Sequence, residues 1–224
     1  MNSPRHAAIR LIQAAFFALL AFVLPAAPGQ AGDQRDPVDF LRSNAAEPPA
    51  NGYLSICHAY GCTRVTRVRL SDAETGRLKT LMAGGKADAA GERAAVASAI
   101  AYLEQLVGPR TGTTTDRDYR DLASGGDPTQ MDCIDEASNT TSYLILLRQL
   151  GLLRHHEIAY PASKGFLINF VYPHFTAVLV EKGSGTSYAV DSWVFTNGEK
   201  PIIAPLDAWY ETKSATFYQR RKGA

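Results

Sequence analysis

Residues 132–150 read Asp-Cys-Ile-Asp-Glu-Ala-Ser-Asn-Thr-Thr-Ser-Tyr-Leu-Ile-Leu-Leu-Arg-Gln-Leu and predict one strong helix. Asp132 is a favourable N-cap, Asp135 stands where its side chain can bond back to the cap, and Gly151 follows the last apolar residue. Beyond this helix the apolar period changes from 3.6 to 2, which predicts strands. We expect them at residues 156–160, 166–171, 174–181 and 188–195, with one or two short strands in 201–221.

The chain before this segment predicts a strand and two further helices. Residues 63–70 alternate in polarity, as a half-buried strand does. Ser71 and Glu74 form a capping box that starts a helix ending near Met82. Residues 91–107 are rich in alanine and carry a broad apolar stripe at helical spacing, which is typical of a core helix.

The order of these elements predicts the fold class. Helices come first and strands follow, so we expect an α+β fold in which N-terminal helices, including the one that begins at Cys133, pack on an antiparallel sheet. A polar loop at residues 108–131 is long enough to be suspected of lining a site, although a solvated loop is the simpler interpretation.

The first 31 residues predict a signal peptide. Arg5, His6 and Arg10 give a positive start, residues 14–28 form an uncharged apolar run, and Ala31 offers a small residue for cleavage. This run of about fifteen residues is shorter than the roughly 20 that span a bilayer, although an uncleaved anchor is the alternative. We therefore expect a periplasmic or secreted protein, with no stable membrane insertion after cleavage near Ala31.

The remaining chain predicts one domain. Residues 32–51 are polar and contain three prolines, which indicates an arm before a single domain at residues 52–224. Without Arg5 and Arg10, the 23 basic residues fall to 21, against 22 acidic ones. This balance does not indicate binding to nucleic acid or to an anionic membrane surface.

The three cysteines differ in their spacing. Cys57 and Cys62 lie close together, and Cys133 is far from both. In an oxidising compartment the two neighbours can form a disulfide and leave Cys133 free. A metal site at Cys57, His58 and Cys62 is the alternative, but structural zinc takes four ligands and the sequence has no second cluster of Cys or His. We expect the disulfide and no metal.

Cys133 is the candidate nucleophile. The first turn of a helix offers unpaired N–H groups and the positive end of the dipole, which lower the pKa of a thiol and can bind an oxyanion. Asp132, Asp135 and Glu136 act against ionisation, since negative neighbours disfavour a thiolate. The sequence therefore requires a cation nearby, although a buried inert cysteine is the plainer interpretation of Cys133 alone.

His174 and Asp191 are the candidate partners. His174 opens one predicted strand, and alternation in the next strand puts Asp191 and Trp193 on one face. An acid in an apolar strand is costly unless it is paired, and a neighbouring histidine would pair it. Asp191 would then orient the imidazole, and Trp193 would cover the pair from water. Each residue alone could be structural, so the inference depends on the joint pattern.

These motifs resemble those of a known superfamily. Cys133 in Asp-Cys-x-Asp, His174 in His-x-x-Ala-Val-Leu and Asp191 in Val-Asp-Ser-Trp resemble the transglutaminase-like superfamily, and within it the bacterial exported cysteine proteinases. The resemblance covers about a third of the chain, residues 127–194. It implies a papain-like core and a Cys-His-Asp triad of these three residues. The chain departs from the group's usual pattern at Met131, commonly glycine, and at Ile134, commonly an acid.

This pattern predicts an exported thiol hydrolase or acyltransferase that cleaves or transfers amide bonds, in the first place a cysteine peptidase. The expected substrate is a protein or a peptidoglycan peptide, and we expect no cofactor. Gln130 or the backbone N–H of Cys133 could donate to the oxyanion. The alternative function is a catalytically silent domain of the same fold that binds a periplasmic or cell-wall partner.

Overall fold

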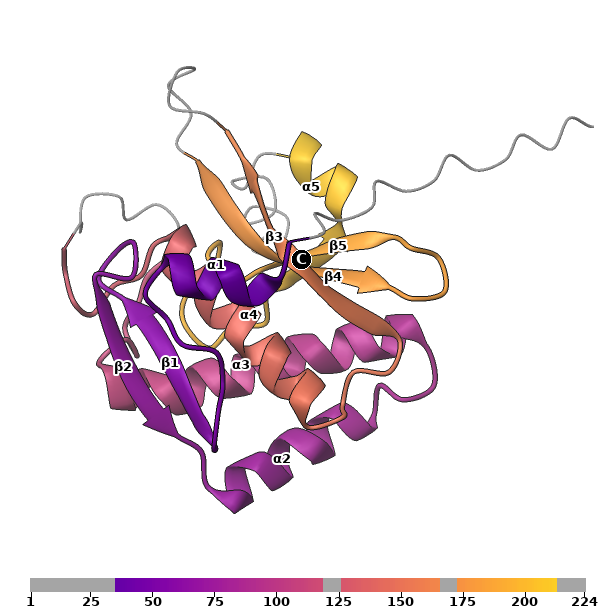
Figure 1. Ribbon diagram of the computed structural model, residues 1–224, viewed down its shortest axis with the longest axis horizontal. Helices are drawn as coiled ribbons and strands as arrows, with labels where there is room; N and C mark the ends of the chain where they lie inside the picture. The colour runs from indigo at the N-terminus through magenta and orange to yellow at the C-terminus, as the bar shows by residue number, and fades with distance from the viewer. Residues whose placement is uncertain (1–34, 119–125, 166–172, 213–224) are drawn as a thin grey trace, which may run out of the picture.

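The computed structural model describes residues 35–118, 126–165 and 173–212 (Figure 1). Within these ranges the chain forms five helices and two antiparallel sheets, which confirms the α+β class. In chain order the elements are α1 (Pro37–Ser43), β1 (Tyr53–His58), β2 (Arg64–Arg69), α2 (Asp72–Ala83), α3 (Ala89–Thr111), α4 (Cys133–Gln149), β3 (His156–Lys164), β4 (His174–Glu181), β5 (Ser187–Asp191), β6 (Ile202–Pro205) and α5 (Leu206–Glu211).

The larger sheet has the strand order β3-β4-β5-β6, and all its neighbours are antiparallel. At its centre Ala177 of β4 pairs with Val190 of β5. The register of β3 on β4 shifts between Ala159 and Ala162, around Pro161, which has no N–H to give to the ladder. The smaller sheet is the hairpin of β1 and β2.

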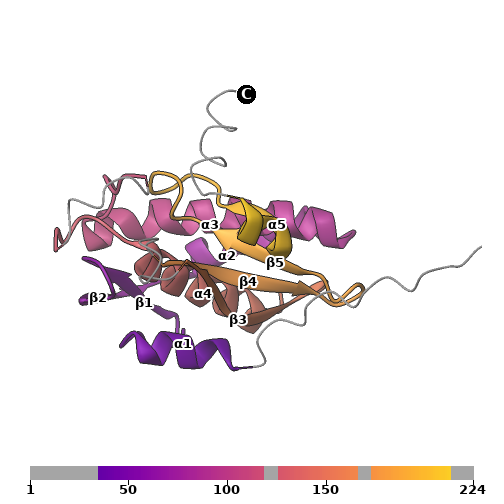
Figure 2. The same cartoon turned by 90° about the horizontal axis from the view of Figure 1, so that it is seen from above.

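Helix α4 is the central element. It contacts both sheets, and in Figure 2 α1 and α3 lie on opposite sides of it. Apart from Ile134, the residues from Cys133 to Leu147 are buried, including the polar run Ser138 to Ser142. A helix that is buried on all sides is held by tertiary contacts rather than by one apolar stripe.

The helix starts follow the predicted capping chemistry. The Asp132 side chain accepts hydrogen bonds from the N–H groups of Ile134 and Asp135, both at 3.0 Å, and Asp135 accepts from the Asp132 N–H at 3.1 Å. A second capping box, formed by Ser71 and Glu74, starts α2. These local signals explain why both helices begin at the predicted residues.

The N-terminal half holds two elements that the sequence did not predict. The segment predicted as a polar arm, residues 32–51, contains α1 in its described part, and this helix packs on β3 and α4 through buried Phe40 and Leu41. The sequence analysis also missed β1, a strand whose residues are nearly all buried. Residues 1–31, the predicted signal peptide, lie outside the described residues. None of the described helices has the length and apolarity needed to cross a membrane.

Element ends in the rest of the chain also differ from prediction. Helix α3 continues through Pro109 to Thr111, so the loop begins later than residue 108. Strand β5 ends at Asp191, four residues before the predicted end, and Trp193 lies in the turn that follows. The strand predicted at 166–171 falls outside the described residues. The region 201–212 holds the strand β6 and, instead of a second strand, the helix α5.

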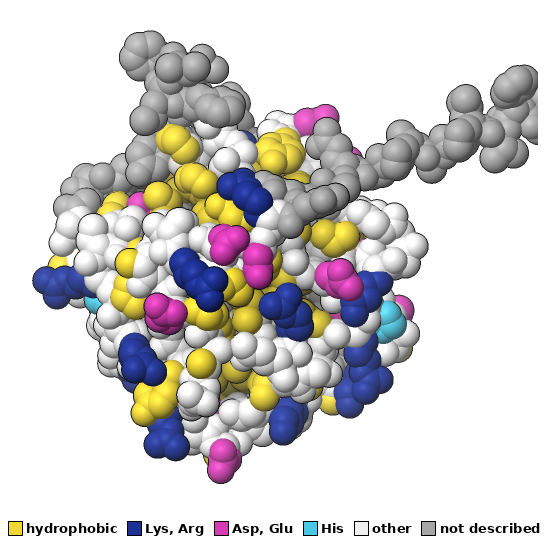
Figure 3. Space-filling model, viewed as in Figure 1, with side chains coloured by type: hydrophobic (Ala, Val, Ile, Leu, Met, Phe, Trp, Pro, Cys, Tyr) yellow, Lys and Arg dark blue, Asp and Glu magenta, His cyan; other side chains and the backbone are white. Residues whose placement is uncertain are grey.

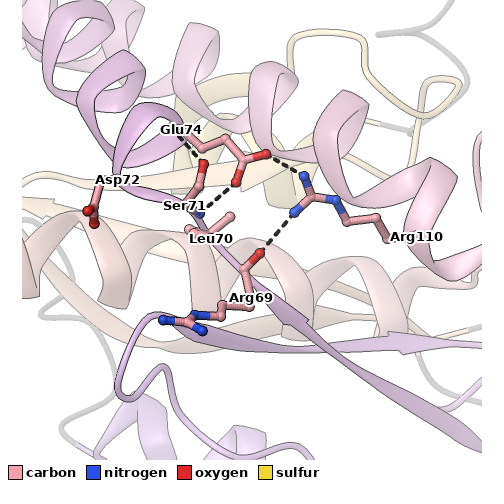
Figure 4. A pocket seen from close by; sticks show the side chains of 6 residues that line it. All are labelled: Arg69, Leu70, Ser71, Asp72, Glu74 and Arg110. Atoms are coloured by element: carbon pink, nitrogen blue, oxygen red, sulfur yellow. Dashed lines mark hydrogen bonds and ion pairs between the residues drawn. The ribbon is translucent and has the colours of Figure 1, made fainter.

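A surface hollow lies where α2 begins beside the end of α3 (Figure 4). Arg110 donates to the Arg69 carbonyl at 2.9 Å and pairs with the Glu74 carboxylate, which also accepts from the Ser71 N–H at 2.7 Å. The polar groups that line the hollow therefore bond to one another. We interpret them as a partly exposed clamp between two helices, a kind of ion pair that contributes about 0–1 kcal/mol to stability.

Candidate active site

His174 and Asp191 meet at one end of the larger sheet. His174 is the first residue of β4, and Asp191 is the last residue of β5. One step beyond the Ala177–Val190 pair, the β4–β5 register sets Asp191 opposite Thr176, two residues from His174 and therefore on the same face. His174 Nε2 lies 2.7 Å from Asp191 Oδ2, and both side chains are buried.

This bond sets the tautomer of the imidazole. A carboxylate only accepts hydrogen bonds, so His174 carries its proton on Nε2 and leaves a lone pair on Nδ1 when the ring is neutral. His174 Nδ1 is buried and has no hydrogen-bond partner among the described residues. An unpartnered buried nitrogen is costly in a folded protein and calls for an explanation.

The other buried histidines of the described chain differ in this respect. His58 uses both ring nitrogens, on the Pro128 carbonyl at 2.7 Å and the Thr66 hydroxyl at 2.9 Å. His156 bonds Glu92 at 2.9 Å and Arg93 at 3.1 Å. His156 with Glu92 is thus also a buried histidine–carboxylate pair, but it has no nitrogen left to accept a proton. The free nitrogen distinguishes His174.

Aromatic rings enclose the pair. The Trp193 ring centroid lies 4.8 Å from that of His174, and the Trp209 ring centroid lies 5.4 Å away. Trp209 also donates from Nε1 to Asp191 Oδ2 at 2.8 Å, the oxygen that His174 binds. The sequence analysis missed Trp209, because its segment was expected to form a strand with no link to the site.

Lys164 holds Trp209 in place. Its ammonium donates to the carbonyls of Trp209 and Thr212, both at 2.7 Å, and lies 4.1 Å from the Trp209 ring centroid. Lys164 is the register partner of His174 on the neighbouring strand. Burial lowers its pKa, while the negative charge of Asp191 raises it. No sequence signal linked this lysine to the histidine, because the register shift at Pro161 decides the pairing.

Cys133 lies against the same end of β4. It is fully buried at the first position of α4, and its thiol donates to the Pro173 carbonyl at 3.4 Å. The backbone N–H of Phe175 also faces the sulfur. The sulfur therefore contacts the backbone on both sides of His174, while its hydrogen bond goes to Pro173 and not to the imidazole.

Burial and, to a smaller extent, the negative charges of Asp132 and Asp191 together raise the pKa of the Cys133 thiol to about 12. The sequence predicted that Asp132 would disfavour the thiolate, and burial is the larger cause that the sequence did not indicate. Asp135 turns away and accepts from the N–H groups of Tyr60 at 2.8 Å and Cys62 at 2.6 Å. In this arrangement the thiol is protonated at neutral pH, so a reaction requires a base.

Gln130, the suggested oxyanion donor, is committed elsewhere. Its amide NH₂ donates to the Thr115 carbonyl at 3.1 Å, and its carbonyl accepts from the Arg117 N–H at 3.1 Å. The side chain therefore fixes the loop before α4. The backbone N–H of Cys133 remains the better candidate, since it donates to no other residue within the described ranges.

Cys57 and Cys62 form the predicted disulfide, and Cys133 is free. The two sulfurs and a carboxylate oxygen of Asp135 lie within 4.8 Å of one another, as metal ligands would. Because the sulfurs are bonded to each other, they are not thiolate ligands. Among the described residues, no other group of three His, Cys, Asp or Glu side chains comes this close.

The Trp209 contact yields a prediction. Trp209→Phe keeps an aromatic ring against His174 but removes the N–H that binds Asp191. If His174 and Asp191 act as a base and its orienting acid, kcat should fall about tenfold with KM unchanged, as for the loss of one hydrogen bond to a charged group. Tyr210→Phe, on the exposed neighbour in α5, is the control and should leave kcat unaltered. Equal kcat in both variants would exclude a role for the Trp209 N–H.

Comparison with protein-family models, with curated proteins and with solved structures found no match for this chain. The candidate site is therefore inferred from its geometry alone. On the face shown in Figure 3, basic and acidic side chains are interspersed and no area of one charge covers the surface.

Proposed function

We propose that this protein is an exported thiol hydrolase or acyltransferase of the transglutaminase-like kind, which cleaves or transfers amide bonds with Cys133, His174 and Asp191. The observation that carries the proposal is the buried Nδ1 of His174, which has no hydrogen-bond partner in the part of the chain that the structure describes. Its other nitrogen is fixed by Asp191, and the Cys133 sulfur lies against the backbone on both sides of the ring. A base with an oriented lone pair beside a thiol is the arrangement that nucleophilic catalysis needs.

The reaction begins with rotation of the thiol from Pro173 toward the imidazole. His174 Nδ1 takes the thiol proton, and the Cys133 sulfur attacks the carbonyl carbon of the substrate. The tetrahedral oxyanion is stabilised by the backbone N–H of Cys133 at the start of α4. The imidazolium then gives its proton to the departing amine, which leaves a thioester on Cys133.

The second half of the cycle regenerates the thiol. Water gives a proton to His174 Nδ1 and attacks the thioester carbonyl, and the proton returns to the sulfur as the acid departs. An amine in place of water would give transfer instead of hydrolysis. Asp191 keeps the imidazole oriented and stabilises its positive charge in both halves. Hydrolysis of a peptide or isopeptide bond is the activity we expect first.

A catalytically silent binding domain is the second candidate. The full burial of Cys133 and its raised pKa favour this function, since a substrate must reach the sulfur before it can react. In a binding domain, His174 and Asp191 would only stabilise the fold and would have no catalytic role. The two functions differ in whether an acyl group ever becomes bound to Cys133.

Covalent capture tests the proposed function. The protein should hydrolyse amide bonds in a mixture of unfolded proteins or of peptidoglycan peptides. Mass spectrometry of acid-quenched samples should find an acyl group on Cys133 that hydroxylamine removes, as expected for a thioester. Cys133→Ser should lose both signals. A wild-type protein with no turnover and no adduct in either mixture would favour the binding domain.

A further inference from the structure

The loop that joins β1 to β2 has an unusual backbone. The disulfide links Cys57, next to the last residue of β1, to Cys62 in the loop. Four consecutive residues have positive φ angles: 70° at Ala59, 67° at Tyr60, 65° at Gly61 and 54° at Cys62. Only the glycine adopts this left-handed region at little cost, so the other three residues must be held there by their surroundings.

Asp135 supplies that support and joins the loop to α4. Its buried carboxylate accepts the N–H groups of Tyr60 at 2.8 Å and Cys62 at 2.6 Å. The same carboxylate accepts the Asp132 N–H at 3.1 Å and so closes the capping box of α4. One side chain therefore fixes both the left-handed loop and the turn that carries Cys133.

Two further attachments hold the loop on either side of Cys133. Before it, the Ala59 N–H donates to the Gln130 carbonyl at 2.9 Å. After it, the Asn139 side chain accepts from the Cys57 N–H at 2.7 Å and donates to the Cys57 carbonyl at 2.9 Å. Cys133 thus lies within a segment, residues 130–139, that is bonded to the loop at both ends and at Asp135 in the middle.

We infer that Asp135 and the Cys57–Cys62 disulfide form one positioning unit for Cys133. The disulfide keeps the loop in the left-handed form that aims two N–H groups at Asp135, and Asp135 fixes the first turn of α4. The inference deepens the proposed function and rests on it, because a fixed sulfur matters only if Cys133 reacts. Small displacements of a nucleophile lower kcat while leaving substrate binding intact.

Two variants interrupt the unit at different points. Asp135→Asn keeps one oxygen but replaces the other by an NH₂ group, which cannot accept a hydrogen bond. The N–H groups of Tyr60, Cys62 and Asp132 then cannot all find an acceptor. The double variant Cys57→Ala with Cys62→Ala removes the covalent closure and leaves Asp135 intact. Asp88→Asn is the matched control, because it makes the same change in the carboxylate that caps α3, where Asp88 accepts from the Gly91 N–H at 2.7 Å.

Amide hydrogen exchange at pH 8 tests the coupling without any substrate. Peptides that cover residues 131–137 should exchange at least about tenfold faster in Asp135→Asn and in the double variant, as for the loss of a buried hydrogen bond. Asp88→Asn should not accelerate this exchange. Unchanged exchange in both test variants, or equal acceleration in the control, would overturn the inference whether or not the protein is an enzyme.

Turnover then shows whether the coupling positions the nucleophile. Asp135→Asn and the double variant should each lower kcat at least about tenfold with KM unchanged, whereas Asp88→Asn should keep kcat. The triple variant should be no slower than the worse of the two, since both changes break one unit. If the losses in kcat were additive, the disulfide and Asp135 would act independently, which would contradict the inference. Absent turnover in the wild type would refute the proposed function, while hydrogen exchange would still decide on the coupling.

Discussion

Replacing His174 with alanine is expected to lower the rate of amide hydrolysis by about 10⁴-fold or more, the scale seen when a catalytic triad loses its base. The reason lies in the environment of Cys133. With a pKa of about 12, only about one thiol in 10⁵ is ionised at pH 7. His174 Nδ1 is the buried acceptor that can take the proton during the attack.

The control for this variant is His155→Ala. His155 is partly exposed, and its ring forms a hydrogen bond with the Lys86 carbonyl. It directly precedes β3, whose other end carries Lys164, the register partner of His174. Its loss should leave the rate within about twofold of wild type, the usual effect of a surface change. The measurement is kcat/KM on the best substrate found, with folding checked by thermal denaturation. A folded His174→Ala variant that keeps more than a tenth of wild-type activity would contradict the account.

The second large effect concerns stability and pH. Burial raises the pKa of Glu104 from 4.5 to about 7 and that of Asp116 from 3.8 to about 8. Burial also raises the pKa of Glu136 well above 4.5, and the negative charges of Glu104 and Asp116 add to this. These acids come from α3, from the loop before α4 and from α4 itself. Because the charge of one raises the pKa of another, they form one buried acidic cluster.

The sign of the effect follows from proton linkage. Between the unfolded and folded pKa values the native chain holds protons that the unfolded chain has released, so stability falls as pH rises. The contribution is complete below pH 4 and is lost as the pH passes through 7 to 8. We expect the free energy of unfolding to drop by at least about 2–3 kcal/mol between pH 5 and pH 8, at 1.36 kcal/mol per unit for each proton.

Glu136→Gln should flatten this dependence, because the amide is neutral at every pH. Glu74→Gln is the control: hydrogen bonding to Arg110 lowers the pKa of Glu74, so its loss should not flatten the fall at high pH. Urea denaturation at pH 5, 6.5 and 8 measures the effect. A free energy of unfolding that is constant or rises over this range would show that the acids are not buried together.

Local chemistry explains which elements the sequence predicted. Helix α4 begins at Cys133 because Asp132 and Asp135 satisfy the first N–H groups, and both residues are visible in the sequence. Alternation predicted β4 and the approach of His174 to Asp191, because neighbouring strands place such residues on one face.

What the sequence did not predict depends on contacts between distant segments. Strand β1 is buried on both faces and contains Ser55 and His58, so it shows neither alternation nor an apolar run. Trp209 reaches Asp191 from a short helix that no pattern indicated. The burial of Cys133 outweighs the helix dipole, and burial is a property of the whole fold.

The pH dependence of Cys133 alkylation tests the central claim, the coupling of Cys133 to His174, most directly. Iodoacetamide labelling of Cys133 is followed by mass spectrometry in the wild type, His174→Ala and Asp191→Asn. In the wild type His174 Nδ1 should take the thiol proton as the sulfur attacks, so labelling should proceed well below the thiol pKa of about 12, and His174→Ala should move the midpoint of the labelling profile up by more than about one unit. Asp191→Asn should keep a reactive thiol while turnover falls. One profile common to all three proteins, with a midpoint near about 8.5 as for a free cysteine, would contradict the triad.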